Sequence, residues 1–130
     1  MSQANVEIVR RAVEAWERGD TAGALSFWHD QIEWVPPPDD PDYAVVQGTV
    51  AAADALTRWL TTWDSYRYEL TALIDVDDHV IQAGRQTMDT RGAEVASEVF
   101  FVWTFRDRRA IRMRMFYRRV EALEAVGLAE

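Results

Sequence analysis

The chain has 130 residues, which is enough for a single domain with one hydrophobic core, so we treat residues 1–130 as one domain. Its net charge of −8 argues against a nucleic-acid or anionic-membrane partner, because binding phosphate groups requires a basic surface. The absence of cysteine excludes disulfides, thiol nucleophiles and thiolate metal sites.

The N-terminal segment, MSQANVEIVRR, reaches charged residues early and has no apolar run of signal-peptide length. No stretch approaches the ~20 apolar residues of a membrane-spanning helix. We therefore expect a cytoplasmic protein that does not associate with a membrane.

The first half of the chain predicts three helices and one short strand. Apolar residues recur every three or four positions up to Trp16, which is typical of an amphipathic helix, and Gly19-Asp20 ends it and begins a second helix from Thr21 to about His29. A strand over 31–35 ends at three prolines, which lack the amide hydrogen that strand pairing needs. After a stiff acidic loop, Gly48 precedes a third helix over about 49–63.

The second half predicts a run of four strands and a short final helix. Strands are expected over about 66–75, 79–90, 94–105 and 111–117, with turns at Asp77-Asp78 and Arg91-Gly92. The motif VEALEAV then has helical spacing, and Gly127 ends it. This order predicts an α+β fold, in which helices pack on one face of a mixed, mainly antiparallel sheet.

Seven arginines lie between Arg106 and Arg119, which is the one argument in favour of nucleic-acid binding. Because Arg112 and Arg114 alternate with methionines and form no continuous stripe, we interpret them as a solvated strand face.

The Gly19-Asp20 turn, the strand Ile32-Glu33-Trp34, Gly48 and the ending VWTFRD to EALEAVGL together resemble the SnoaL-like branch of the nuclear transport factor 2-like superfamily. The resemblance implies a cone, in which a strongly bent sheet wraps around a long helix and leaves a pocket at the wide end. Relatives include ketosteroid isomerases, polyketide cyclases, scytalone dehydratase and limonene epoxide hydrolase. The fold alone therefore does not select a reaction.

Alignment on ketosteroid isomerases separates this chain from that activity. Their general-base Asp falls on Pro36, their oxyanion-hole Tyr on Ala12 and their protonated Asp on Phe101. None of these three side chains can transfer or donate a proton.

The same alignment predicts a concave wall rich in aromatic and thioether side chains, which suits a flat or lipophilic small molecule. The wall is expected to comprise Trp34, Tyr66, Tyr68, Ile81, Ala83, Arg85, Thr87, Val99, Phe101, Trp103, Met113, Met115 and Tyr117. The residues expected to bind a ligand are Trp34, Tyr66, Tyr68, Arg85, Thr87, Phe101, Trp103, Met115 and Tyr117.

The predicted catalytic residues are Arg85, as electrophile or water-orienting group, with Tyr68 or Tyr117 as hydrogen-bond donor. A guanidinium in an aromatic cavity must pair with a carboxylate, a carbonyl or a bound anion. Arg85 can instead reach solvent or pair structurally with an acidic side chain, and the tyrosines can be core residues bonded to backbone carbonyls.

Two histidines and a group of three aspartates are the remaining candidates for a metal or catalytic site. His29 and His79 have no ligand spacing, so we take them as surface residues and expect no metal and no cofactor. Asp39, Asp40 and Asp42 form a carboxylate cluster, which is either an exposed acidic turn or a lid over the pocket that supplies a base.

The favoured function is binding of a small hydrophobic metabolite, with cofactor-independent isomerisation, cyclisation, dehydration or epoxide opening as the chemistry. The alternative is a non-catalytic binding or dimeric assembly domain whose core is filled. Phe100, Val102 and Phe116 point away from the pocket and would leave an apolar patch on a monomer, so we expect a homodimer through them.

Overall fold

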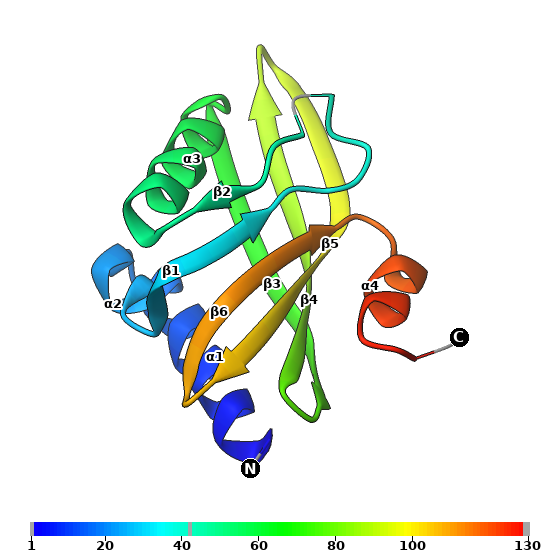
Figure 1. The fold of residues 1–130 in the computed structure, drawn as a ribbon. Coiled ribbons are helices and arrows are strands. Elements are labelled where there is room, and N and C mark those ends of the chain that lie inside the picture. Colours follow the sequence, from blue (N-terminus) through cyan, green and yellow to red (C-terminus); the bar gives the residue numbers. More distant parts are fainter. Residues whose placement is uncertain (1, 42, 129–130) are drawn as a thin grey trace.

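A computed structural model describes residues 2–41 and 43–128 of the chain. Within them, a six-stranded sheet has the order β2-β1-β6-β5-β4-β3, in which β1 and β6 are parallel and all other neighbours antiparallel (Figure 1). The helices are α1 (Ser2–Glu17), α2 (Thr21–Leu25), α3 (Thr49–Thr61) and α4 (Arg119–Ala125). The strands are β1 (Trp28–Val35), β2 (Val46–Gln47), β3 (Ser65–Val76), β4 (His79–Thr90), β5 (Ala93–Arg106) and β6 (Arg109–Phe116). This confirms the predicted α+β class and element order.

The junction between α1 and α2 has the predicted caps, but α2 is shorter than predicted. Gly19 has a φ of +81°, and the carboxylate of Asp20 accepts a hydrogen bond from the backbone N–H of Gly23 at 2.9 Å. The predicted extension of α2 to His29 is wrong. The carbonyl of Phe27 already accepts from the backbone N–H of Ala110 at 2.9 Å, so the chain has joined the sheet before that residue.

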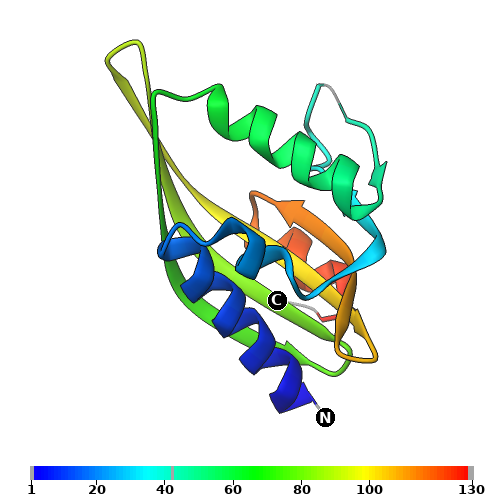
Figure 2. The ribbon, with the colours of Figure 1, turned by 90° about the vertical axis from the view of Figure 1, so that its left-hand side faces the viewer.

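Irregular pairing bends the sheet around the helices. The register shifts between Leu70 and Ala72 of β3 and between Thr104 and Phe105 of β5, and an extra residue in one strand increases the local bend and twist. Figure 2 shows α1 and α3 together on the side toward which the long strands curve.

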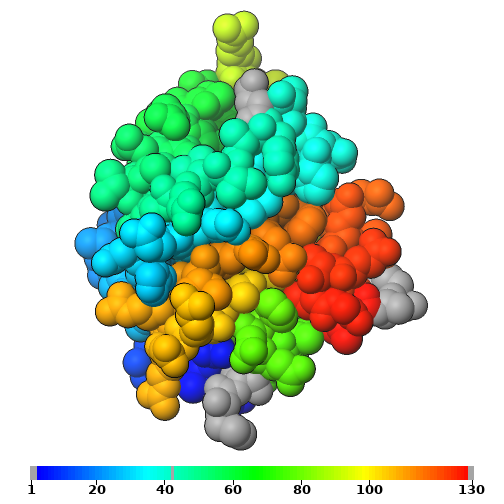
Figure 3. Space-filling model, in the orientation of Figure 1, coloured from blue at the N-terminus to red at the C-terminus, as the bar shows by residue number. Residues whose placement is uncertain are grey.

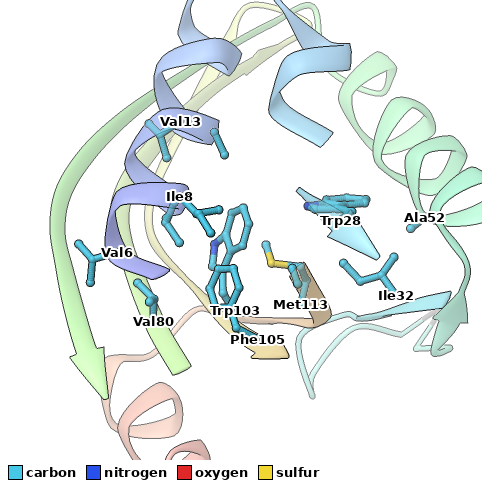
Figure 4. Packing of buried hydrophobic residues seen from close by; sticks show 13 residues of the cluster. Val6, Ile8, Val13, Trp28, Ile32, Ala52, Val80, Trp103, Phe105 and Met113 are labelled. Atoms are coloured by element: carbon cyan, nitrogen blue, oxygen red, sulfur yellow. The ribbon is translucent and has the colours of Figure 1, made fainter. Parts of the chain in front are cut away.

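The main core lies between α1 and this concave face. Val9 and Val13 of α1 are buried in the same cluster as Trp103, Phe105 and Met113, and Figure 4 shows Trp103 next to Ile8 of α1, with Met113 between Trp103 and Ile32. The Trp103 and Phe105 rings are stacked at 5.7 Å between centroids. Val13, Trp103 and Met113 also line the cavity described below, so this part of the core forms part of the cavity wall.

Helix α4 packs on the opposite, convex face, so the expectation that all helices share one face is wrong. Its buried Ala122 and Leu123 belong to a second cluster with Phe100 and Val102, and Phe116 packs against that cluster. Figure 3 shows α4 (red) next to β6 (orange).

The position of α4 also corrects the argument for a homodimer. Phe100 and Val102 are only 2% and 0% exposed, because the chain's own C-terminal helix covers them. The apolar patch from which the dimer was predicted is therefore not a free surface.

None of the helices in the described part of the chain is long and apolar enough to cross a membrane.

Candidate functional site

A cavity of about 480 Å³ lies between the concave face of the sheet and the helices. Its helical side is lined by Ala12, Val13 and Trp16 of α1, Ala24 and Leu25 of α2, and Ala55, Leu56, Arg58, Trp59 and Leu60 of α3. Its sheet side is lined by Trp28, Trp34, Tyr66, Tyr68, Gln82, Phe101, Trp103, Met113 and Met115, with Pro36, Pro37, Asp40, Ala44, Val46, Thr62 and Tyr117 completing it. The volume falls within the range of about 300–1,000 Å³ that is usual for small-molecule sites.

The aromatic part of the wall is a continuous set of tilted rings. Trp34 lies 6.0 Å from Trp28 and 6.3 Å from Phe101 between ring centroids, and Phe101 meets Tyr68 edge-on at 6.5 Å. Such offset and edge-on contacts leave ring faces available to a flat guest while fixing the wall's shape.

One chain of hydrogen bonds crosses the floor of the cavity. The indole N–H of Trp103 donates to the Gln82 side-chain carbonyl at 2.9 Å, and the Gln82 side-chain N–H donates to the Tyr68 hydroxyl oxygen at 2.8 Å. Gln82 is only 7% exposed, so both ends of a buried amide are satisfied by residues on neighbouring strands.

A second chain lies alongside the first. The Tyr66 hydroxyl donates to the Gln86 side-chain carbonyl at 3.1 Å, and the Gln86 side-chain N–H donates to the Ser97 hydroxyl at 3.1 Å. Gln86 is only 1% exposed. Among the described residues, Gln82 and Gln86 are the two buried polar side chains, and each holds a tyrosine.

Gly84 makes room for one of these tyrosines. It lies on β4 between Gln82 and Gln86, and a Cβ atom at this position would overlap the ring and the hydroxyl oxygen of Tyr68. The glycine therefore lets the Tyr68 ring lie close over the strand, within reach of Gln82.

Burial keeps the tyrosine hydroxyls protonated. It raises the pKa of Tyr68 to about 12, against a smaller lowering by the hydrogen bond from Gln82. It also raises the pKa of Tyr66, with the neighbouring Tyr68 and Tyr117 as further causes. The pKa of Tyr117 is raised by burial and then by the nearby Asp40 carboxylate. All three phenols are thus neutral hydrogen-bonding groups near pH 7.

Seven of the residues expected to bind a ligand line the cavity: Trp34, Tyr66, Tyr68, Phe101, Trp103, Met115 and Tyr117. Asp40 of the acidic loop lines it as well, whereas Asp39 is exposed and Asp42 lies outside the described residues. The positions aligned with the acid–base groups of ketosteroid isomerases, Ala12, Pro36 and Phe101, also line the cavity.

The placement of Arg85 and Thr87 on the concave wall is wrong. Arg85 is exposed on the convex face, where it lies in register with Glu69 and Glu98 on the adjacent strands. Ile81 and Ala83, also predicted on the concave wall, lie on that convex face instead and belong to the cluster beneath α4. Alternate residues of a strand face opposite sides, so the inward residues of β4 are the even-numbered ones, including Gln82 and Gln86.

The two histidines lie away from the cavity. The Nδ1 atom of His29 accepts from the backbone N–H of Gln31 at 3.0 Å, and the Nδ1 atom of His79 forms a hydrogen bond with the Thr104 hydroxyl at 3.0 Å. Over the described residues, no group of three His, Asp or Glu side chains is arranged to hold a metal ion.

Comparisons with known proteins agree with this architecture. The sequence model of a protein family, described as the SnoaL-like domain, matches residues 9–113 of this chain. No curated protein matches the chain.

Many solved structures share the fold. Bal32a, from a soil-derived mobile gene cassette, has a TM-score of 0.81 at 21% identity and covers 96% of this chain and 97% of its own. TerC, co-crystallised with polyporic acid, has a TM-score of 0.77 at 24% identity over 95% of this chain and 98% of its own. AclR, a putative hydroxylase from Streptomyces galilaeus, has a TM-score of 0.71 at 15% identity over 98% of both chains. At these identities the similarity shows the fold.

Proposed function

Because the chain belongs to the SnoaL-like domain family, as its sequence pattern predicted, we propose that its cavity binds a small, flat and mostly apolar organic molecule. The observation that carries this proposal is the cavity of about 480 Å³ lined by aromatic and thioether side chains. A filled core, the alternative function considered from the sequence, would leave no such volume. TerC, a protein of the same fold, was crystallised with an organic acid, polyporic acid.

The cavity wall offers apolar surfaces for one face of a flat ligand and hydroxyl groups for one of its edges. Trp34 and Phe101 present ring surfaces, and Met113 and Met115 present adaptable thioether groups. Of the polar groups that line the cavity, the Tyr66 and Tyr68 hydroxyls would orient a molecule lying on these surfaces. A flat molecule with a few oxygen atoms on its rim therefore matches the wall better than a flexible chain or a sugar.

A saturation experiment tests the proposal. The flat ketone 9-fluorenone is equilibrated across a dialysis membrane with the protein, and we expect saturable binding of one molecule per chain. Replacing the cavity-lining Ala55 by Trp should abolish this binding, because the indole would fill part of the cavity. Ala51, on the exposed side of the same helix, provides the matched control Ala51→Trp. Equal binding by both variants would place the ligand elsewhere and contradict the proposal.

A specific arrangement at the cavity mouth favours acid–base catalysis as a second candidate. The Asp40 carboxylate lines the cavity and lies close enough to Tyr117 to raise the pKa of that phenol. Asp40 would remove a proton from a carbon of the ligand, and a tyrosine hydroxyl would hold the developing oxyanion. Asp40→Asn should then abolish turnover of a substrate while leaving its affinity within about twofold, and unchanged turnover would contradict this role.

A further inference from the structure

We infer that Tyr68 presents its hydroxyl proton to the cavity as a fixed donor, so that the site selects ligands placing a carbonyl-type acceptor oxygen there. The inference rests on the proposed binding function and adds the chemistry by which the ligand is selected. It makes Tyr68 a specificity-determining residue, with Gln82 and Trp103 as the residues that position its proton.

The direction of the hydrogen-bond chain is set at Trp103. An indole N–H can only donate, and Trp103 is 4% exposed, so its N–H must find an acceptor inside the protein. The acceptor 2.9 Å away is the side-chain oxygen of Gln82. This contact fixes which end of the Gln82 amide is oxygen and which is nitrogen.

The fixed amide then fixes the phenol. The side-chain nitrogen of Gln82 can donate hydrogen bonds but cannot accept them, so the Tyr68 hydroxyl oxygen 2.8 Å away must accept from it. A phenol has one proton, and that proton must point in another direction. Among the residues that the structure describes, none accepts it, and Tyr68 lines the cavity. The free donor is therefore available to a guest in the cavity.

Two further features keep this donor in place and protonated. Gly84 leaves the space that the Tyr68 ring occupies over β4, so the ring stays within reach of Gln82. Burial raises the pKa of Tyr68 to about 12, so the phenol donates a proton to a hydrogen bond near pH 7 and does not act as a base.

The neighbouring chain has no such fixed direction, which makes Tyr66 a matched control. Gln86 lies between two hydroxyl groups, those of Tyr66 and Ser97, and each hydroxyl can donate or accept. Reversing the Gln86 amide would leave both bonds intact. Tyr66 can therefore serve either a donor or an acceptor on the ligand and does not discriminate between them.

The resulting ligand class is a flat molecule with a ketone or quinone carbonyl. Its rings would lie on Trp34 and Phe101, and its carbonyl oxygen would meet the Tyr68 hydroxyl. A hydrocarbon of the same shape would bury the Tyr68 hydroxyl without an acceptor, so it should bind more weakly than the ketone.

The test compares two probes of the same shape, 9-fluorenone and fluorene, which differ by one carbonyl group. Equilibrium dialysis gives the dissociation constant of each for the unmodified protein, Tyr68→Phe and Tyr66→Phe. We expect Tyr68→Phe to weaken fluorenone about three- to tenfold, the range of one neutral hydrogen bond, and to change fluorene less than twofold. Because the carbonyl of fluorenone is placed at Tyr68, Tyr66 touches only the part that the two probes share, and Tyr66→Phe should change both ligands by similar factors.

A spectroscopic readout reports the hydrogen bond itself. The infrared carbonyl band of bound fluorenone should lie at lower frequency in the unmodified protein and return toward its apolar-solvent position in Tyr68→Phe. Trp103→Phe keeps an aromatic ring but frees the Gln82 amide to reverse, so the band should shift back in part. This partial shift would not follow from a merely structural role of Trp103.

The outcomes separate the inference from the proposed function. Suppose that both probes bind and that Tyr68→Phe either weakens the binding of both equally or changes the binding of neither. Tyr68 is then not the discriminating donor, and the inference is overturned while the proposed binding function stands. If neither probe binds the unmodified protein, the proposed function is overturned and the inference with it. Selective loss of fluorenone in Tyr68→Phe supports both.

Discussion

Gly84 provides the sharpest structural prediction, because its missing side chain is what admits Tyr68. A Cβ atom at position 84 would overlap three atoms of Tyr68: the hydroxyl oxygen and two ring carbons. The backbone cannot easily yield, since Gly84 pairs with Leu70 on one side and Val99 on the other. In Gly84→Ala the Tyr68 ring must therefore either stay strained or swing away from Gln82.

Both routes destabilise the folded chain. Overpacking typically costs about 1–3 kcal/mol, and a swung ring would give up its hydrogen bond with Gln82, which is worth about 1 kcal/mol. The usual gain from replacing glycine, about 0.4–1 kcal/mol through the unfolded state, offsets part of this cost. The net loss is then about 1–2 kcal/mol, equivalent to a fall in Tm of about 3–10 °C for a domain of this size.

Thermal unfolding followed by circular dichroism measures this loss, and a double-mutant cycle assigns it to Tyr68. In the background Tyr68→Val the ring is absent, so Gly84→Ala should become neutral or slightly stabilising. The coupling between the two positions should then exceed about 1 kcal/mol. A rise in Tm in the unmodified background, or the same cost in both backgrounds, would refute the packing argument.

Four further predictions concern other parts of the molecule. Burial, and secondarily the charge of Arg114, lowers the pKa of His79 in the folded chain, so on acidification the imidazole of the unfolded chain is protonated first. The stability present above pH ~6.5 should therefore fall as the pH drops. His79→Gln should flatten the fall in Tm between about pH 7 and 5. Arg85→Ala, on the exposed face, should change stability by less than about 0.5 kcal/mol and leave fluorenone affinity unchanged in dialysis; a loss of affinity would return Arg85 to the site. Deleting residues 119–130 should expose Phe100 and Val102, and sedimentation should then show larger species than the full chain forms at equal concentration. A steroid enone should not be isomerised faster than with an unrelated acidic protein, because no aligned acid–base position carries a proton donor or acceptor; turnover followed by ultraviolet absorbance would contradict that alignment.

The parts of the fold that were predictable from sequence depend on local chemistry. The Gly19-Asp20 caps and the end of β1 before Pro36 follow from backbone conformation and from the missing amide hydrogen of proline. The end of α2 was less predictable, because the pairing of Phe27 with Ala110 joins segments far apart in the sequence. Tertiary contacts of this kind override a local helix pattern.

The inward face of β4 was in fact accessible from the sequence. The turn at Arg91-Gly92 has two residues, so Thr90 pairs with Ala93, and counting back along both strands places Gln82 opposite Phe101. Directly opposed residues share a face of the sheet. With Phe101 inward, the same register requires Gln82 to be inward and Arg85 to be outward.

Because of the bulge in β3, an uninterrupted count along β3 gives a different register. Counting from the turn at Asp77-Asp78 without interruption places Tyr68 opposite Thr87, which would bring Thr87 and Arg85 inward with the tyrosines. The extra residue near Thr71 shifts the pairing by one, and Tyr68 then lies opposite Gln86. Nothing in the local sequence marks that position as a bulge.

The buried indole of Trp103 offers a second route to the same face, and it leads to the proposed donor. An inward tryptophan needs an acceptor on a neighbouring strand. Its neighbours on β6, Met113 and Met115, offer only weakly accepting thioether sulfur, whereas Gln82 on β4 offers an amide oxygen. A donor-only group buried next to a single strong acceptor therefore specifies the register of β4, the orientation of the Gln82 amide and the direction in which the Tyr68 proton points.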